Sequence, residues 1–218
     1  MKLKVLVIVA TYNERDSLPR LVECLEAIIP DSSILIIDDD SPDGTGNWAQ
    51  THAKTRSEFD VVIRKGERGL GSATVTGIRW GLEREFEFLV TLDADLSHPP
   101  ERIPEMLELL QANPQVGVVI GSRYVPGGRI EGWPLKRKIV SRLTNWLGKY
   151  WLGLKVNDST GAFRVYRSSE LRKLNLDTIK AQGYGYLEEL LFRLQRLSIG
   201  TSRISIDSRC SRNNSSSK

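Results

Sequence analysis

The chain has 218 residues, of which 40% are hydrophobic and 27% charged, and its formal net charge is +4. This length suits one domain with a sizeable core, and this composition is ordinary for a globular protein, so extensive disorder is excluded. The mild positive charge is compatible with a nucleic acid, an anionic membrane surface or a phosphorylated substrate, and only the positions of the charges decide among them.

Cysteine usage and hydropathy indicate the compartment. Cys24 and Cys210 are far apart and have no metal-ligand spacing, which favours a reducing compartment over a disulfide scaffold. The apolar run at residues 5–9 is too short for a signal peptide, and no stretch approaches the roughly 20 apolar residues that span a bilayer. We therefore expect a cytoplasmic protein without a transmembrane helix.

Short runs rich in β-branched residues alternate with helical patterns along the first two thirds of the chain. Strands are predicted at residues 3–9, 34–37, 61–63, 88–92 and 116–120. Helices are predicted between them at residues 17–29, 45–55, 72–83 and 101–111. Continuous apolar strands separated by helices indicate an α/β fold with a mostly parallel sheet covered on both faces. In such sheets ligands bind beyond the carboxyl ends of the strands.

The pattern changes from about residue 125. The remaining predicted elements are a long basic, aromatic helix at residues 133–154, a strand at 163–166, an amphipathic helix at 186–197 and a weak strand at 203–206. The residues after this weak strand are rich in Ser, Arg and Asn, which predicts a frayed tail.

Two of the five predicted strand ends carry clustered carboxylates, at residues 38–40 and at Asp93 and Asp95. A single Asp at such a position is ordinary turn chemistry. Two acidic clusters at one edge instead favour oxygen ligands for Mg²⁺ or Mn²⁺ bridging a diphosphate. The first cluster can also accept hydrogen bonds from a nucleobase or ribose. Because three adjacent buried acids without partners would be costly, at least one is expected to face solvent or a ligand.

Glycines follow the third predicted strand in the segment at residues 69–73. Their order, and their place after the third strand, argue against a dinucleotide-binding fingerprint, and no Lys-Ser or Lys-Thr follows to make a phosphate-binding loop. A tight turn with close packing of helix on sheet is the better interpretation.

Fixed positive charge near the strand ends comes from Arg123 and from the basic cluster at residues 136–138. Arg suits bidentate phosphate binding, whereas Lys136 and Lys138 suit solvated surface equally well. The aromatic residues that interleave with them fit either a membrane interface or the core. His98 lies near Asp95 but is expected to end a loop, and no Ser-His-Asp or Cys-His arrangement indicates nucleophilic hydrolysis.

The chain resembles the family 2 glycosyltransferases, and more narrowly the dolichyl-phosphate (polyprenyl-phosphate) β-D-mannosyltransferases, up to about residue 197. The motifs are A-T-Y-N-E at residues 10–14, D-D-D-S-P-D-G-T at 38–45, G-L-G at 69–71, D-A-D-L-S-H-P at 93–99, G-S-R-Y at 121–124, G-W at 132–133, N-D-S-T-G-A-F-R-V-Y at 157–166 and G-Y-G-Y-L-E-E at 183–189. Ala10 stands where relatives usually carry Pro, a change expected mainly to loosen the loop.

The resemblance implies a GT-A fold, that of nucleotide-diphospho-sugar transferases, in three layers with a mostly parallel central sheet. It implies GDP-mannose as donor, a divalent cation (Mg²⁺ or Mn²⁺) as cofactor, and a polyprenyl or dolichyl phosphate in a membrane as acceptor. The protein would then lie peripherally on the cytoplasmic membrane face. Residues 1–197 would form the catalytic domain.

The resemblance also implies roles for individual residues. The implied donor-binding residues at the first two strand ends are Ala10, Tyr12, Glu14, Ile37 and Asp39. The last four of these would hold the guanosine. The implied contacts to diphosphate and mannose are Asp93, Ala94 and Asp95, and Arg123 is a further implied donor-binding residue. Asp95 and Ser97 would hold the metal, and Arg123 and Arg137 would meet the acceptor phosphate.

The end of the chain departs from the family pattern. Relatives carry an Arg-x-x-Gly-x-Ser-Lys segment that closes over the donor. Here Arg212 and Lys218 keep their separation and are predicted donor contacts, but Ser215 replaces the glycine and the preceding strand is poorly apolar. We therefore expect residues 198–218 to be a degenerate or truncated C-terminal segment.

The expected reaction is inverting transfer of mannose from GDP-mannose to a polyprenyl phosphate, with Asp95, Arg123 and Arg137 as catalytic residues. The acceptor is already an anion near neutral pH and needs no general base. One alternative is a UDP-glucose-type donor with an undecaprenyl phosphate or polysaccharide acceptor. Another is a nucleotide-sugar-binding module with impaired turnover. Nucleic acid is disfavoured because the carboxylates would repel its backbone, and the sequence leaves the oligomeric state open.

Overall fold

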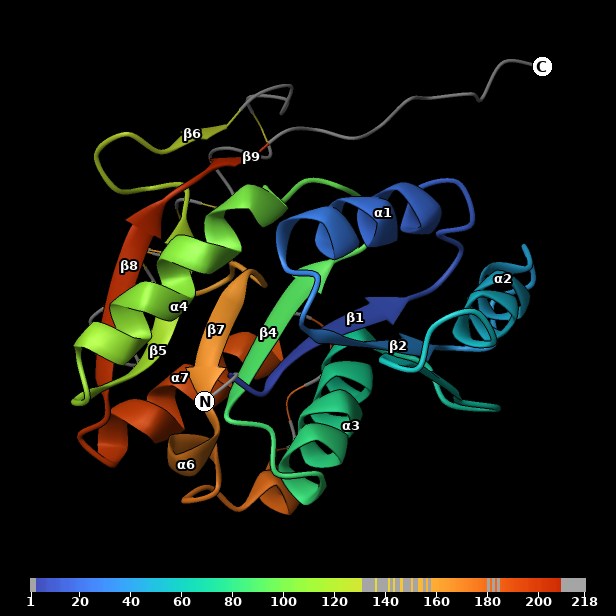
Figure 1. Cartoon of the computed structure of the whole chain (residues 1–218). Helices are drawn as coiled ribbons and strands as arrows, with labels where there is room; N and C mark the ends of the chain where they lie inside the picture. Colours follow the sequence, from blue (N-terminus) through green and yellow to red (C-terminus); the bar gives the residue numbers. More distant parts are fainter. Residues whose placement is uncertain are drawn as a thin grey trace.

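The structure is a computed structural model that describes residues 3–130, 136, 141, 143, 146, 150, 153–154, 156, 158–179, 181, 183 and 185–208. Within these residues, seven strands form one sheet in the order β3-β2-β1-β4-β7-β5-β8 (Figure 1). The strands are β1 (Val5–Thr11), β2 (Ser33–Asp38), β3 (Phe59–Ile63), β4 (Phe88–Asp93), β5 (Val116–Ser122), β7 (Arg164–Arg167) and β8 (Gly200–Ser205). A small second sheet pairs β6 (Arg129–Ile130) with β9 (Asp207–Ser208).

Most neighbouring strands of the large sheet are parallel. β3, β2, β1 and β4 run parallel to one another, and β8 runs parallel to β5. Only β7 is antiparallel to its neighbours β4 and β5 among the described strands. The predicted mostly parallel α/β sheet is therefore confirmed.

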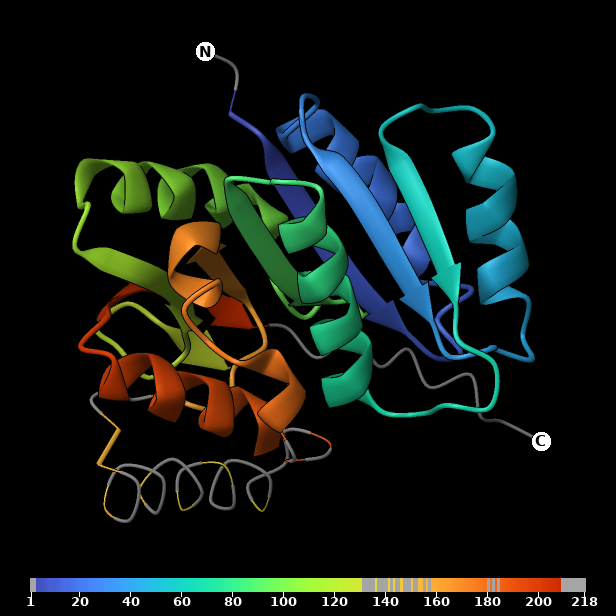
Figure 2. The same ribbon diagram turned by 90° about the horizontal axis from the view of Figure 1, so that it is seen from below.

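Helices cover both faces of this sheet, as Figure 2 shows in the turned view. The helices are α1 (Leu18–Ile28), α2 (Thr45–Ala53), α3 (Leu70–Glu83), α4 (Ile103–Ala112), α6 (Ser168–Leu171) and α7 (Gly185–Arg196), with short 3₁₀ turns η1 (Pro100–Arg102) and η2 (Leu176–Thr178). One apolar core lies under α1, α2 and α4, and the other lies under α3, α6 and α7. Along β1 the side chains alternate between the two cores, because successive residues of a strand face opposite sides.

The elements predicted for the first 120 residues are confirmed, with shifts of a few residues at their ends. The strand at 164–167 and the helix at 185–196 are confirmed as well. The predicted helix at 133–154 lies mostly outside the described residues, although its described members from Lys136 to Tyr150 are helical. No described helix is both long enough and apolar enough to span a bilayer.

The weak strand predicted at 203–206 is β8, which begins three residues earlier than predicted, at Gly200. It is an edge strand in which Ile204 is buried, so its apolar content is low and its pairing with β5 defines it. The division of the chain at residue 198 stays a prediction, since residues 209–218 lie outside the described part.

The register of the central strands brings the predicted functional segments together. Ala10 of β1 lies opposite Ile37 of β2 on one side and Asp93 of β4 on the other. Thr11 lies opposite Asp38 in the same ladder. The acidic segments that are 55 residues apart in the sequence (38 and 93) thus lie one strand on either side of β1.

Close packing of α3 on the sheet gives a first prediction. A Cβ at Gly77 would overlap with Cγ2 of Ile8 and lie 3.4 Å from Cγ1 of Ile37. In a helix interior Ala is favoured over Gly by about 1 kcal/mol, but an added methyl in a packed core costs about 1–3 kcal/mol. We expect Gly77→Ala to lower the free energy of unfolding by about 1 kcal/mol in urea denaturation, despite its better helix propensity.

The control for this substitution is Thr76→Ala, at the half-buried neighbouring position of the same helix. It should change the free energy of unfolding by no more than about 0.5 kcal/mol. A Gly77→Ala protein that is more stable than the native one would contradict the close approach of α3 to β1.

Candidate active site

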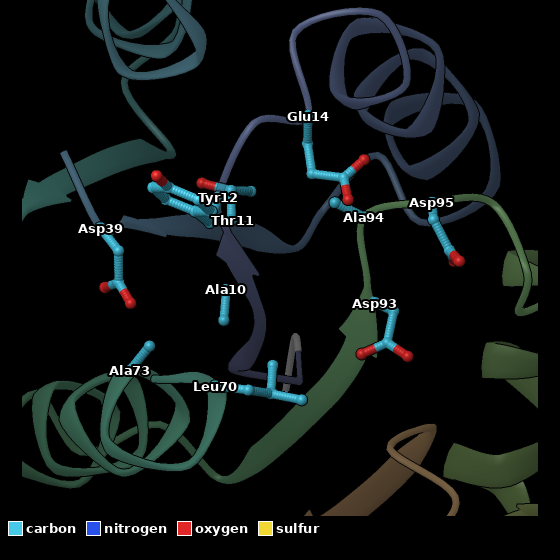
Figure 3. Close-up of a pocket in the computed structure, with 10 residues that line it drawn as sticks. All are labelled: Ala10, Thr11, Tyr12, Glu14, Asp39, Leu70, Ala73, Asp93, Ala94 and Asp95. Carbon is cyan, nitrogen blue, oxygen red and sulfur yellow. The ribbon is translucent and has the colours of Figure 1, made fainter. Parts of the chain in front are cut away.

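A pocket of about 240 Å³ opens at the carboxyl ends of β1, β2 and β4 and at the start of α3 (Figure 3). Its lining residues are Ala10, Thr11, Tyr12, Glu14, Asp39, Leu70, Ala73, Asp93, Ala94 and Asp95. Seven of the donor-binding residues predicted from the sequence are among them. In the close-up Asp39 stands on one side of the pocket, and Glu14, Asp93 and Asp95 stand on the other.

The remaining predicted residues lie elsewhere. Ile37 is fully buried in the core under α3 and does not line the pocket. Ser97 follows the pocket-lining segment, and its backbone N–H donates to Oδ1 of Asp95 at 2.9 Å. Arg123 lies at the end of β5, also outside the pocket lining. Three further predicted site residues lie outside the described part of the chain: Arg137, Arg212 and Lys218.

The three acids after β2 have three different environments. Asp38 is buried and accepts hydrogen bonds from the Thr11 hydroxyl at 2.8 Å and from the backbone N–H and hydroxyl of Ser41 at 2.9 and 2.6 Å. It therefore ties the end of β1 to the loop before α2. Asp40 is exposed, with a φ of 54°. The expectation that at least one of these acids faces solvent is confirmed.

Asp39, the middle acid, lines the pocket and is paired with a buried cation. Nε of Arg64 donates to Oδ1 of Asp39 at 2.7 Å, and Nη2 of Arg64 lies 2.5 Å from the same oxygen. The backbone N–H of Gly69 donates to Oδ2 at 2.8 Å. Only about 5–6% of either side chain is exposed, so the pair fixes the carboxylate rigidly at the pocket wall.

Negative charge is concentrated on the opposite wall. Burial raises the pKa of Glu14, and the charges of Asp95 and Asp93 reinforce this shift against the hydrogen bond from Ser17. Removal from bulk water also raises the pKa of Asp93, with Asp95 adding to the shift and His98 opposing it. This wall would therefore gain from a bound cation, which would relieve the repulsion among the carboxylates.

The donor atoms in and directly after the acidic pocket-lining segment suit a hard divalent cation. Asp95 supplies carboxylate oxygens and Ser97 a hydroxyl, both of the oxygen type that Mg²⁺ and Mn²⁺ prefer. No group of three His, Cys, Asp or Glu side chains that could enclose a metal occurs in the described part of the chain. Asp95 and Ser97 therefore offer two oxygen donors of the type such a cation binds, with other coordination positions left open.

His98 supports the acidic segment from behind. Only 5% of the residue is exposed, and Nδ1 accepts a hydrogen bond from the backbone N–H of Asp93 at 3.2 Å. Its ring is stacked on Phe163, with 5.5 Å between ring centroids and 14° between planes. The ring thus closes the loop that carries Asp93 and Asp95 and anchors it to the core.

Arg123 forms an ion pair with Asp158, a residue that was not predicted individually from the sequence. Nε and Nη2 of Arg123 donate to the two carboxylate oxygens of Asp158 at 2.8 and 2.6 Å, and Asp158 is fully buried. Burial alone would lower the pKa of Arg123, but the hydrogen bond and charge of Asp158 outweigh it and raise the pKa. The only available signal for Asp158 was its place in the motif at 157–166.

Comparison with known proteins fits this geometry. Residues 6–174 match the family described as glycosyl transferase family 2, and the chain belongs to this family. The protein is thus a glycosyltransferase, and its fold is the predicted GT-A fold.

Two relatives are similar over most of their length. The chain is 44% identical to the undecaprenyl-phosphate mannosyltransferase of Micrococcus luteus, over 89% of this chain and 79% of the relative. It is 39% identical to the polyprenol monophosphomannose synthase of Mycolicibacterium smegmatis, over 87% of this chain and 71% of the relative.

Solved structures share the fold at low sequence identity. Glucosyl-3-phosphoglycerate synthase of Mycobacterium tuberculosis, in complex with Mn²⁺, UDP-glucose and phosphoglyceric acid, superposes with a TM-score of 0.71 at 16% identity, covering 97% of this chain and 72% of that one. The mannosyltransferase PcManGT of Pyrobaculum calidifontis, in complex with GDP-Man and Mn²⁺, gives a TM-score of 0.64 at 16% identity, covering 99% of this chain and 59% of that one.

The different environments of the acids after β2 give a second prediction. Both carboxylate oxygens of Asp38 accept hydrogen bonds from Thr11 and Ser41, and Asp38→Asn replaces one of these oxygens by an NH₂ group, which can only donate. We therefore expect this substitution to lower the free energy of unfolding by about 1–3 kcal/mol. Asp40→Asn should cause no measurable change, because the residue is exposed and Asn tolerates a positive φ. Urea denaturation of both variants measures the difference, and equal losses would contradict the structural role of Asp38.

Proposed function

We propose that the protein transfers mannose from GDP-mannose to a polyprenyl phosphate, with inversion at the sugar carbon. The observation that carries this proposal is the pocket, which gathers seven predicted donor-binding residues from three strand ends. The names of the two relatives, which describe mannosyl transfer to polyprenyl phosphates, support the choice of sugar and acceptor.

The two walls of the pocket would divide the donor between them. The nucleoside would lie beside Tyr12 and Asp39, where Tyr12 is 40% exposed and Asp39 presents a fixed carboxylate. A carboxylate accepts hydrogen bonds only, which matches ribose hydroxyls and the N–H groups on the guanine edge. The diphosphate would lie toward Asp93 and Asp95, at the end of β4.

A divalent cation, Mg²⁺ or Mn²⁺, would be held by Asp95 and Ser97. Bound there, it would neutralise negative charge on the leaving diphosphate. The chain's own residues would place the donor: Glu14 and Asp93 flank the same space, and His98 keeps the acidic segment in position. This preorganisation lowers the cost of reaching the transition state.

The acceptor phosphate would approach from the side of β5. A phosphate monoester is an anion near neutral pH, so it can attack the sugar carbon without a general base. Arg123 would orient it together with Arg137, and the ion pair with Asp158 would hold the Arg123 guanidinium in place.

Three exposed apolar residues support a surface through which the protein would reach a lipid. Leu143, Trp146 and Tyr150 are helical and are 53%, 57% and 74% exposed, and the rings of Trp146 and Tyr150 stack with centroids 5.5 Å apart. Spacings of three and four residues place them on one helix face. Trp and Tyr favour the membrane–water interface, so we propose that this face lies peripherally on the cytoplasmic membrane surface.

The central prediction concerns metal-dependent transfer. We expect the native protein to transfer mannose from GDP-mannose to a polyprenyl phosphate in the presence of Mn²⁺ or Mg²⁺. Asp95→Asn should lower kcat by about 100-fold or more, because it removes the charged ligand of the cation that would neutralise the leaving diphosphate, and a chelator should abolish transfer. Radiolabelled mannose in the lipid fraction measures the product.

Asp40→Asn, an exposed acid on the same rim, is the matched control and should retain native transfer. Full activity of Asp95→Asn, or transfer that survives the chelator, would contradict the metal role. A preference for UDP-glucose over GDP-mannose in direct competition would contradict the proposed donor.

A separate prediction tests the membrane face. The double variant Trp146→Ala/Tyr150→Ala should bind vesicles of anionic phospholipid more weakly than the native protein, because interfacial aromatic area is lost. Its affinity for GDP should stay unchanged, since neither residue lines the pocket. Vesicle sedimentation measures the first quantity and calorimetry the second; equal sedimentation of variant and native protein would rule this face out.

A further inference from the structure

Arg64 is a buried cation beside the pocket that no motif in the sequence pointed to. It follows β3, and only 6% of the residue is exposed. Its guanidinium makes the ion pair with Asp39 and also donates to Oγ of Ser72 at 2.9 Å and to the backbone carbonyl of Gly69 at 3.2 Å. A further contact, 3.2 Å to the carboxylate of Glu67, lies at the exposed edge. Arg64 thus joins the end of β2 to the turn before α3.

The same turn is fixed from the other side by Asp39. Its Oδ2 accepts the backbone N–H of Gly69, the residue before α3. Gly69 has a φ of 141°, in the region that glycine tolerates and other residues rarely adopt. Because Leu70 and Ala73 of the first turn of α3 line the pocket, the Arg64–Asp39 pair sets the positions of both the Asp39 carboxylate and the start of α3.

A buried ion pair contributes little net stability to a loop, because both charges must first lose their hydration. Desolvating two charges takes several kcal/mol, and apolar replacements of similar volume are often as stable. What such a pair adds is a defined geometry for each charged group. Here the defined group is the carboxylate of Asp39, which lines the pocket with its hydrogen-bond acceptors in fixed positions.

We propose that Arg64 is a positioning residue for the nucleoside of the donor. It acts through Asp39, holding the carboxylate and the start of α3 in the binding geometry before the donor arrives. This inference rests on the proposed function, since it takes the pocket to bind a nucleoside diphosphate. Preorganisation of this kind raises affinity by reducing the ordering that binding would otherwise require.

The test compares the two ends of the donor. Calorimetry with Mn²⁺ measures the Kd for GDP, which spans both walls, and for inorganic pyrophosphate, which needs only the acidic wall. Arg64→Lys keeps the charge but loses the planar fork, and we expect it to weaken GDP binding about tenfold while leaving pyrophosphate binding unchanged. A merely structural lesion would weaken both ligands together.

A double-mutant cycle identifies the route of the effect. If Arg64 acts through Asp39, the Arg64→Lys/Asp39→Asn protein should bind GDP within about twofold of Asp39→Asn alone. If the double variant instead loses GDP affinity by the product of the two single-variant losses, Arg64 does not act through Asp39.

The matched control is Arg56→Lys, at the opposite end of β3. Arg56 also pairs with a carboxylate, Glu26 at 2.9 Å, and donates to the carbonyls of Pro30 and Ser32, but it is remote from the pocket lining. Its substitution should leave both affinities unchanged.

The outcomes separate this inference from the proposed function. Native protein that binds GDP, with an Arg64→Lys variant that binds it equally well, overturns the inference alone. Native protein that binds UDP but not GDP overturns the proposed donor, and the same variants are then measured with UDP. Native protein that binds no nucleotide overturns both.

A second variant covers the case in which Arg64→Lys does not fold, as judged by circular dichroism. Ser72→Ala removes one hydrogen bond to the Arg64 guanidinium and leaves the ion pair in place. We expect it to weaken GDP binding about two- to fivefold with no change for pyrophosphate. An unchanged Kd for GDP in this folded variant would overturn the inference.

Discussion

The pairing of β1 with β2 on one side and β4 on the other is the constraint on which the rest of the structure depends. Ala10 lies opposite both Ile37 and Asp93, so the loops after these three strands begin at the same height on the sheet. Because side chains alternate along a strand, a slip of one residue would exchange the two apolar faces of β1. Its residues fill both cores, which makes such a slip costly and fixes the positions of the loops.

Those loops produce a pocket with two electrostatically different walls. On the wall formed after β2, Arg64 compensates the charge of Asp39, which leaves a fixed hydrogen-bond acceptor with little net charge around it. On the wall formed after β1 and β4, burial and neighbouring carboxylates raise the pKa values of Glu14 and Asp93, so a nearby cation would stabilise their ionised forms. The first arrangement suits a polar neutral group such as a nucleoside, and the second suits a metal-bound diphosphate.

Much of the fold could be predicted from the sequence, because the β-branched runs and helical patterns of the first 120 residues are strong and local. The gathering of the acidic segments followed from the rule that ligands bind at the carboxyl ends of parallel strands. Edge strand β8 was harder to predict in full, since its hydrogen bonds to β5 define it more than its own apolar content does.

Side-chain pairs between distant residues were beyond sequence reasoning. Asp39 and Arg64 are 25 residues apart, and Arg123 and Asp158 are 35 apart, so neither pair leaves a local pattern. Burial of the Ile37 side chain was also not predicted, since the alternation along β2 that turns it into the core under α3 shows only once the strand is placed. Its implied contact with guanosine stays a prediction.

A crystal structure of the protein with GDP and Mn²⁺ bound would test the division of the pocket most directly. We expect the nucleoside beside Asp39 and Tyr12, the metal at Asp95, and the diphosphate between them. A nucleotide bound with its base against Asp93 and Asp95, or bound in the separate cavity lined by Leu96, Arg102 and Asp207, would contradict this division.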